Sequence, residues 1–165
     1  MKPIIKLLVF LFLFVVSSPI YAEESGNPKE VLAKVKDAVE FLSKAGESGF
    51  AEFNTDKGKW SWKDTYVFIM KCDEVALYGH PNPNLRHKDL SKLKDKNGNY
   101  FFIQLCDAAK NSKGGWIEYL WPKPGETTPS RKISYVIQVP GTPYQAGAGV
   151  YNEDVSMDEL NKLIE

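Results

Sequence analysis

Three adjacent segments in the C-terminal half of the chain decide the fold. They read Gly114-Gly-Trp-Ile-Glu-Tyr-Leu-Trp-Pro-Lys-Pro124, Arg131-Lys-Ile-Ser-Tyr-Val-Ile-Gln-Val-Pro-Gly-Thr-Pro-Tyr144 and Gln145-Ala-Gly-Ala-Gly-Val-Tyr151. Aromatic and β-branched residues recur along them, and proline and glycine punctuate the connections, which is typical of strands joined by turns. We therefore predict strands at 116–121, 132–139 and 144–151.

Successive side chains of a strand point to opposite faces of the sheet. In the middle strand, this alternation places Lys132, Ser134, Val136 and Gln138 on one face, and Ile133, Tyr135, Ile137 and Val139 on the other. In the first strand, Tyr119 and Trp121 share a face with Ile117, and Trp116 takes the opposite one. These aromatic residues, together with Tyr151, suit either a plain core or the wall of a small-ligand pocket.

The rest of the chain is predicted to cover this sheet. Asn27 and Glu30 predict the capped start of a helix, whose apolar residues then recur at helical spacing as far as Leu42. We interpret 66–70 and 75–80 as a hairpin, 100–110 as a helix, and 156–159 as the capping box of a short last helix. This order predicts an α+β domain with a mostly antiparallel sheet and its helices on one side.

The N-terminal residues indicate export. Lys2 and Lys6 flank the start of an apolar run at 7–16, and Ala22 precedes a polar stretch, which is the order of a cleaved secretory signal peptide. We expect a signal peptide at 1–22, a single domain at 23–165, and a periplasmic or secreted location. An uncleaved anchor, which would tether the domain to the membrane, is the alternative. In an oxidising compartment, the pair Cys72 and Cys106 favours a disulfide.

Composition and motifs narrow the class of protein. The chain has 165 residues, 43% hydrophobic and 25% charged, which is ordinary for one globular domain. Its 21 acidic and 21 basic residues give no clustered basic face, so we expect no nucleic-acid partner. No Ser/His/Asp order or carboxylate pair predicts an enzyme, and the two histidines lack metal-ligand spacing. We expect neither a metal nor a cofactor.

Several segments, in the right order, resemble the single Cache domain of the second type. They are Tyr78-Gly-His-Pro81, Lys94-Asp-Lys-Asn-Gly-Asn-Tyr-Phe-Phe102, Gly115-Trp-Ile-Glu-Tyr-Leu-Trp-Pro122, Lys132-Ile-Ser-Tyr135, and Val139-Pro-Gly-Thr142 followed by Gly147-Ala-Gly-Val-Tyr151. The similarity, which runs from about Leu32 to Tyr151, implies a PAS-like five-stranded antiparallel sheet with a long N-terminal helix packed on it. It also implies extracytoplasmic sensing, commonly of small carboxylates such as acetate, propionate or pyruvate.

One departure from the family bears on the role of the chain. Family members usually sit between two membrane helices, whereas here only a short polar helix follows the resembling region. We therefore expect a stand-alone exported domain, which either acts in signal transduction or serves as a soluble binding protein. Its expected partners are a small organic acid and a membrane receptor or kinase. A partner-binding protein that has lost its ligand is the alternative.

A buried carboxylate needs charge-assisted donors. Lys132, which matches the Lys-x-Ser-Tyr pattern of the family, is the candidate cation, and a solvated lysine beside Arg131 is the alternative. Tyr135 belongs to the same pattern, but it shares a pocket with Lys132 only if the strand twists or bulges. His80, at the end of a predicted strand, faces the ligand or is structural.

The remaining candidates for ligand binding are aromatic. Tyr119, Trp121 and Trp116 are candidates for the pocket wall. Tyr66, with Trp60 and Trp62, is a candidate for capping the site from the long loop.

Overall fold

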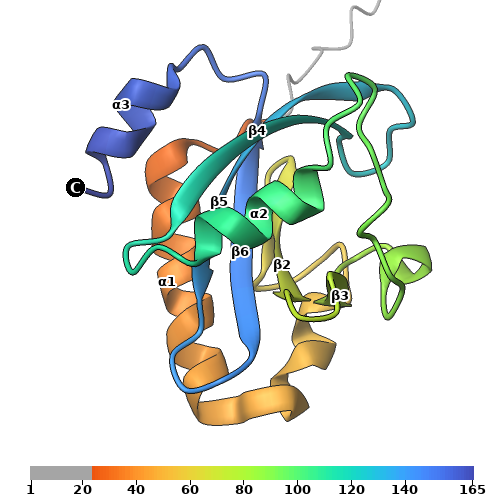
Figure 1. Ribbon diagram of the computed structural model, residues 1–165, viewed down its shortest axis with the longest axis vertical. Coiled ribbons are helices and arrows are strands. Elements are labelled where there is room, and N and C mark those ends of the chain that lie inside the picture. The colour runs from red at the N-terminus through yellow and green to blue at the C-terminus, as the bar shows by residue number, and fades with distance from the viewer. Residues whose placement is uncertain (1–23) are drawn as a thin grey trace, which may run out of the picture.

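The structure of the protein is a computed structural model that describes residues 24–165, so the expected signal peptide at 1–22 lies outside the described residues. The helices and strands are α1 (Pro28–Ala45), η1 (Gly46–Phe53), β1 (Ser61–Trp62), β2 (Thr65–Lys71), β3 (Ala76–Gly79), η2 (Pro83–Leu85), α2 (Phe101–Ala109), β4 (Gly115–Pro122), β5 (Pro129–Gln138), β6 (Tyr144–Tyr151) and α3 (Met157–Lys162). Figure 1 shows the strands between α1 and α2. Within residues 24–165, the structure contains no helix that is both long and apolar enough to span a membrane.

The strands form one antiparallel sheet in the order β1-β2-β6-β5-β4, and β3 pairs with β2 outside this path. The predicted three-stranded meander is confirmed as β4, β5 and β6. Between β5 and β6 the register runs from Lys132↔Tyr151 to Gln138↔Gln145 without a shift. The α+β, PAS-like fold is therefore confirmed, and the two-residue β1 is an addition that the sequence did not predict.

The predicted helix starts are also confirmed. Asn27 and Glu30 form a capping box at the start of α1, and Ser156 and Glu159 form one at the start of α3. Each box satisfies backbone N–H groups that a helix terminus leaves without a partner. Figure 1 shows α3 beyond one end of the sheet, where Leu160 is fully buried.

The helices cover both faces of the sheet, so the prediction that they lie on one side is wrong. One apolar cluster, which we call the α1 face, joins α1 to Val67, Ile69, Ile133 and Ala148. The other, which we call the α2 face, joins α2 to Tyr66, Phe68, Tyr119 and Val136. The physical reason is that every residue of β6 is buried, and a strand buried on both faces needs a cover on each.

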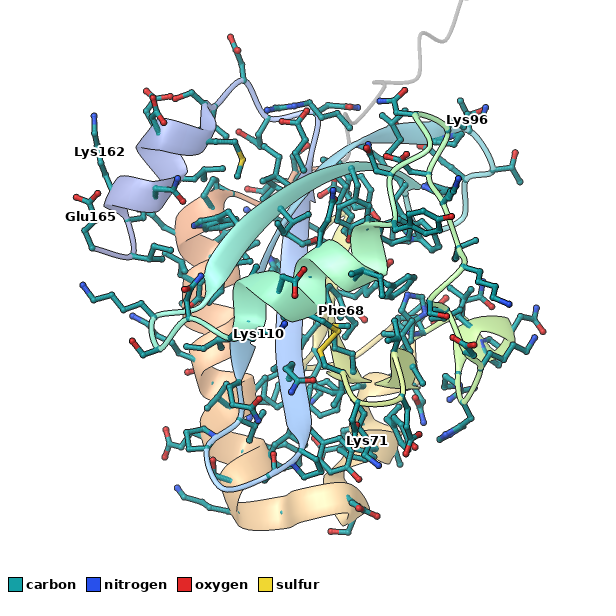
Figure 2. All side chains as sticks on the ribbon, in the orientation of Figure 1. Phe68, Lys71, Lys96, Lys110, Lys162 and Glu165 are labelled. Atoms are coloured by element: carbon teal, nitrogen blue, oxygen red, sulfur yellow. A yellow bond between two sulfur atoms is a disulfide. The ribbon has the colours of Figure 1, made fainter. Side chains whose placement is uncertain are left out.

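A disulfide joins Cys72 to Cys106, as predicted from export. It links the end of β2 to α2, and the two Cα atoms are 5.4 Å apart. The two cysteines are separated by 34 positions in the sequence. Figure 2 shows it in yellow between α2 and the sheet, next to Phe68. The covalent link therefore lies on the α2 face.

Candidate functional site

A small cavity lies between the sheet and α2. Its lining comes from β2, β3, α2, β4, β5 and the residue after β3, namely Tyr66, Phe68, Leu77, His80, Phe101, Phe102, Leu105, Tyr119, Trp121 and Lys132. The volume of the cavity is about 10 Å³, which is close to the room that a single water needs. The fold thus brings together side chains that lie far apart in the sequence around a nearly closed space.

Lys132 is the buried cation of this cavity, with only 1% of its surface exposed. Its Nζ lies 4.2 Å from the ring centroid of Tyr66 and 4.8 Å from that of Tyr151. On β6, Gly149 leaves room for the lysine stem, since a Cβ at that position would lie 3.0 Å from Lys132 Cε. The solvated lysine considered from the sequence is therefore excluded.

The charge of Lys132 has no partner of opposite sign among residues 24–165, where it forms no ion pair. Burial lowers the pKa of Lys132, and the Tyr66 hydroxyl and the charge of Asp64 oppose this effect. Asp64 itself is paired with Lys123, at 2.9 Å. A buried charge without a partner is costly, so the site is suited to an anion that supplies one.

The hydroxyl of Tyr66 is the centre of a small hydrogen-bond network. His80 Nε2 and Trp121 Nε1 both lie 3.2 Å from it. The backbone N–H of Asn82 donates to His80 Nδ1 at 2.9 Å, which places the ring hydrogen of a neutral His80 on Nε2. The Tyr66 oxygen therefore accepts from two N–H donors, and the same hydroxyl also interacts with the side chains of Lys132 and Tyr151.

His80 stays neutral at physiological pH. Burial lowers its pKa to about 3, and the positive charges of Lys132 and Arg86 add to the effect. The ligand-facing and structural alternatives for His80 are not exclusive in this geometry. Its ring lines the cavity and is also fixed by the backbone of Asn82.

Tyr119 and Trp121 complete the wall from β4. The Tyr119 hydroxyl and Ser134 Oγ are 2.9 Å apart, and the Tyr119 ring is stacked on Phe101 with centroids 4.5 Å apart. Burial raises the pKa of Tyr119, so its hydroxyl stays protonated. The polar groups of the wall are thus neutral hydroxyls and N–H donors around one cation.

Trp116 and Tyr135, which the sequence also proposed for the site, lie on the other face of the sheet. Their rings pack against each other with centroids 5.3 Å apart in the α1 face, and neither lines the cavity. The Tyr135 hydroxyl donates to the carbonyl oxygen of Lys113 at 2.7 Å. The pairing of β5 with β4 and β6 is regular here, so no bulge turns Tyr135 toward Lys132.

Several cavity residues were not proposed from the sequence, namely Phe68, Leu77, Phe101, Phe102 and Leu105. Alternation along the predicted strand at 66–70 offers a signal for Phe68, because it puts Phe68 on the same face as Tyr66. The three residues of α2 carried no such signal, because the face of the sheet that a helix covers depends on the path of the chain.

An open groove of about 760 Å³ lies outside the cavity. The two spaces share three side chains, Tyr66, His80 and Trp121, which form the wall between them. Lys63 and Asp56 are among the charged residues that line the groove. Tyr66 thus lies between the cavity and the groove, and its capping of a ligand stays a prediction.

Among residues 24–165, no group of three or more His, Cys, Asp or Glu side chains is arranged to hold a metal ion.

Comparison with known proteins gives consistent relatives. The model of the Cache domain family matches residues 56–156, more than half of the chain. The methyl-accepting chemotaxis protein McpP of Pseudomonas putida is 35% identical over 100 residues, which cover 61% of this chain and 18% of that protein. The sensor histidine kinase MctS of Rhizobium johnstonii is 32% identical over 94 residues, which cover 56% of this chain and 20% of that protein.

The chain therefore spans about a fifth of the length of these curated relatives. Among solved structures, a Cache chemosensory domain that recognises carboxylic acids matches with a TM-score of 0.64 at 27% identity. That match covers 76% of this chain and 92% of the other.

Proposed function

The chain belongs to the Cache domain family, and from this membership we propose that it senses a short-chain monocarboxylate, which binds beside Lys132 in the cavity under α2. Cache relatives of this chain are sensor proteins, a chemoreceptor and a histidine kinase. The proposal adds the class of ligand and the residues that hold it.

The observation that carries the proposal is a buried cation surrounded by donors. Lys132 contributes a buried amino group without an ion-pair partner in the described chain, and Tyr66 contributes a hydroxyl beside it. None of the side chains that line the cavity is a carboxylate. A carboxylate ligand would accept from both donors, and such charge-assisted bonds offset the cost of its desolvation.

The apolar part of the lining suits the other end of such a ligand. Phe68, Phe101, Phe102 and Leu77 offer only carbon surface, which favours a short alkyl or keto group over a second charge. Since Lys132 is the single cation of the lining, a dicarboxylate would leave one buried charge without a partner. The solved Cache domain that recognises carboxylic acids supports this class of ligand.

The small volume of the cavity also favours a second candidate function. At about 10 Å³ the space must widen before an acid enters, and the wall shared with the groove is the direct route. A domain whose cavity stays closed would instead act through its surface, as a partner-binding protein without a ligand. Direct binding measurements separate the two functions.

We further propose an extracytoplasmic location, with a membrane receptor or kinase as the recipient of the signal. The Cys72–Cys106 disulfide supports it, because such bonds persist in oxidising compartments. The mass of the mature N-terminus tests whether residues 1–22 are removed after Ala22 or tether the domain to the membrane.

Titration calorimetry with acetate, propionate, pyruvate, succinate, alanine and methylamine tests the ligand class. We expect the monocarboxylates to bind and Lys132→Met to weaken that binding by about 100-fold or more, because the carboxylate would be buried without its cation. Arg131→Met is the matched control, since Arg131 pairs with Glu118 outside the cavity. If no acid binds the unmodified protein, the partner-binding function replaces the sensor.

A further inference from the structure

We infer that the Cys72–Cys106 disulfide sets the upper size of the ligand, because it holds α2 against the cavity as a fixed wall. This inference rests on the proposed carboxylate site. It assigns to the disulfide a role in selectivity beyond its role in stability.

Helix α2 forms one side of the cavity. Phe101, Phe102 and Leu105 line the space, and Cys106 follows directly on the same helix. Phe101 stacks on Tyr119 from β4. Any outward shift of α2 would therefore enlarge the cavity, and the position of the helix decides how long a ligand fits.

Few directional contacts hold α2 in place. Its N-cap residue, Tyr100, makes no capping hydrogen bond with its side chain. Within residues 24–165, the side chains of Phe101–Ala109 have one polar contact, between Asp107 and the adjacent Lys110. Apolar packing, with the stacking of Phe101 on Tyr119, and the disulfide are thus the described ties between α2 and the sheet.

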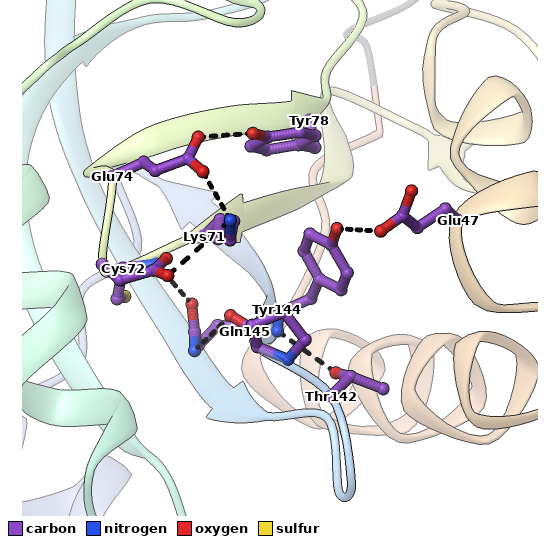
Figure 3. Close-up of polar contacts among 10 residues, drawn as sticks. Glu47, Lys71, Cys72, Glu74, Tyr78, Thr142, Tyr144 and Gln145 are labelled. Carbon is purple, nitrogen blue, oxygen red and sulfur yellow. Dashed lines mark hydrogen bonds and ion pairs between the residues drawn. The ribbon is translucent and has the colours of Figure 1, made fainter.

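The other end of the disulfide is anchored in the sheet. The backbone N–H of Cys72 donates to Gln145 Oε1 at 3.0 Å, as Figure 3 shows. Gln145 is 5% exposed, and its Nε2 donates to Gln138 Oε1 at 2.7 Å. Since these hydrogen bonds join the end of β2 to β6 and β5, the cross-link fastens α2 to three strands of the sheet.

This arrangement limits where the cavity can widen. A disulfide keeps two Cα atoms within about 4.4–6.8 Å of each other, so the end of α2 that carries Leu105 and Cys106 cannot move away from β2. The wall of Tyr66, His80 and Trp121 has no such covalent tie and faces the groove. The cavity can therefore widen on the groove side, around the carboxylate group of an acid. A longer alkyl chain would instead contact Leu105 and Phe102, which cannot move away.

A chain-length series tests the inference. Calorimetry with straight-chain acids from acetate to hexanoate is carried out on the unmodified protein and on the double variant Cys72→Ser/Cys106→Ser. For the unmodified protein we expect affinity to fall by about tenfold or more for the first methylene that no longer fits. In the double variant, the ratio of the Kd for pentanoate to that for the best acid should fall by at least about tenfold.

The control separates selectivity from stability. Leu160→Ala removes a fully buried side chain of the α1 face and weakens the fold without touching α2. It should leave the chain-length ratio unchanged. Circular dichroism at low temperature shows that each variant is folded under the conditions of the titration.

Two results would overturn the inference. An unchanged ratio in the folded double variant would show that the disulfide does not fix the wall. Equal affinity of the unmodified protein for acetate and hexanoate would show that no fixed wall limits the length of the ligand. This result needs no variant, so the inference can be tested even if the double variant does not fold. If the unmodified protein binds no acid at all, the proposed function fails, and this inference falls with it.

Discussion

The two faces of the sheet are built from the same strands, yet they enclose different chemistry. The α1 face packs apolar and aromatic residues, and its Tyr135 hydroxyl is bonded to a backbone carbonyl. The α2 face encloses the ammonium group of Lys132 and the hydroxyl of Tyr66 beside a cavity. Residues on both faces are equally buried, so burial does not distinguish them. The difference lies in a buried lysine, Lys132, that has no ion-pair partner among residues 24–165.

Trp116→Ala should have the largest effect, which is a loss of stability without a loss of carboxylate affinity. Trp116 is 4% exposed in the α1 face, and truncating a buried aromatic residue costs about 3–5 kcal/mol of unfolding free energy. Urea denaturation measures this loss, and calorimetry should show unchanged carboxylate affinity. Phe101→Ala is the counterpart on the α2 face and should lower both quantities. A large loss of carboxylate affinity in Trp116→Ala would show that the α1 face also contributes to ligand binding.

The second effect is a pH dependence that comes from His80. Burial lowers its pKa to about 3, so below pH 6.5 the unfolded chain binds a proton that the folded chain does not. Stability should therefore fall as the pH falls, by about 2 kcal/mol between pH 6.5 and 5 from this residue. Denaturation at pH 6.5 and at pH 5 should show that His80→Gln loses less unfolding free energy between the two pH values than the unmodified protein does. His87→Gln, which changes the other histidine, should keep the full difference.

A third, smaller effect is expected from Tyr66→Phe. The substitution removes the Tyr66 hydroxyl and leaves His80 Nε2 and Trp121 Nε1 without their acceptor. Carboxylate affinity should fall by about tenfold, the value of one hydrogen bond to a charged group. Calorimetry checks the affinity. An unchanged value would mean that the ligand oxygen does not reach Tyr66.

The smallest effect should come from the matched substitution on the other face, Tyr135→Phe. It removes the hydrogen bond to the carbonyl oxygen of Lys113 and should cost about 0.5–1.5 kcal/mol of unfolding free energy. The affinity for carboxylates should not change. If Tyr135→Phe instead weakens binding as much as Tyr66→Phe does, the site extends through the sheet and the comparison fails.

Much of the fold followed from local patterns in the sequence. Alternation along β5 separated Lys132 from Tyr135, and the observed register keeps them apart. The capping residues Asn27 and Ser156 marked the starts of α1 and α3. These features depend only on residues that are close together in the sequence, so they can be predicted from a single sequence.

The parts that could not be predicted depend on contacts between distant segments. Tyr66 became central only because His80 and Trp121, 14 and 55 residues away, meet at its hydroxyl. Phe102 and Leu105 became cavity residues only because α2 crosses the face opposite α1. No local period encodes such meetings, and alternation along 66–70 groups Phe68 and Met70 alike with Tyr66.

The glycine of β6 that accommodates Lys132 has a consequence for sequence variation. A Cβ at position 149 would lie 2.7 Å from the backbone carbonyl oxygen of Ile133, which cannot move aside within the sheet, and 3.0 Å from Lys132 Cε. The contacts with the Ile133 carbonyl oxygen and with Ser134 Oγ therefore exclude a larger residue at position 149 in the observed sheet. A larger residue at position 149 would require β5 and β6 to shift apart, which would also displace the stem of Lys132.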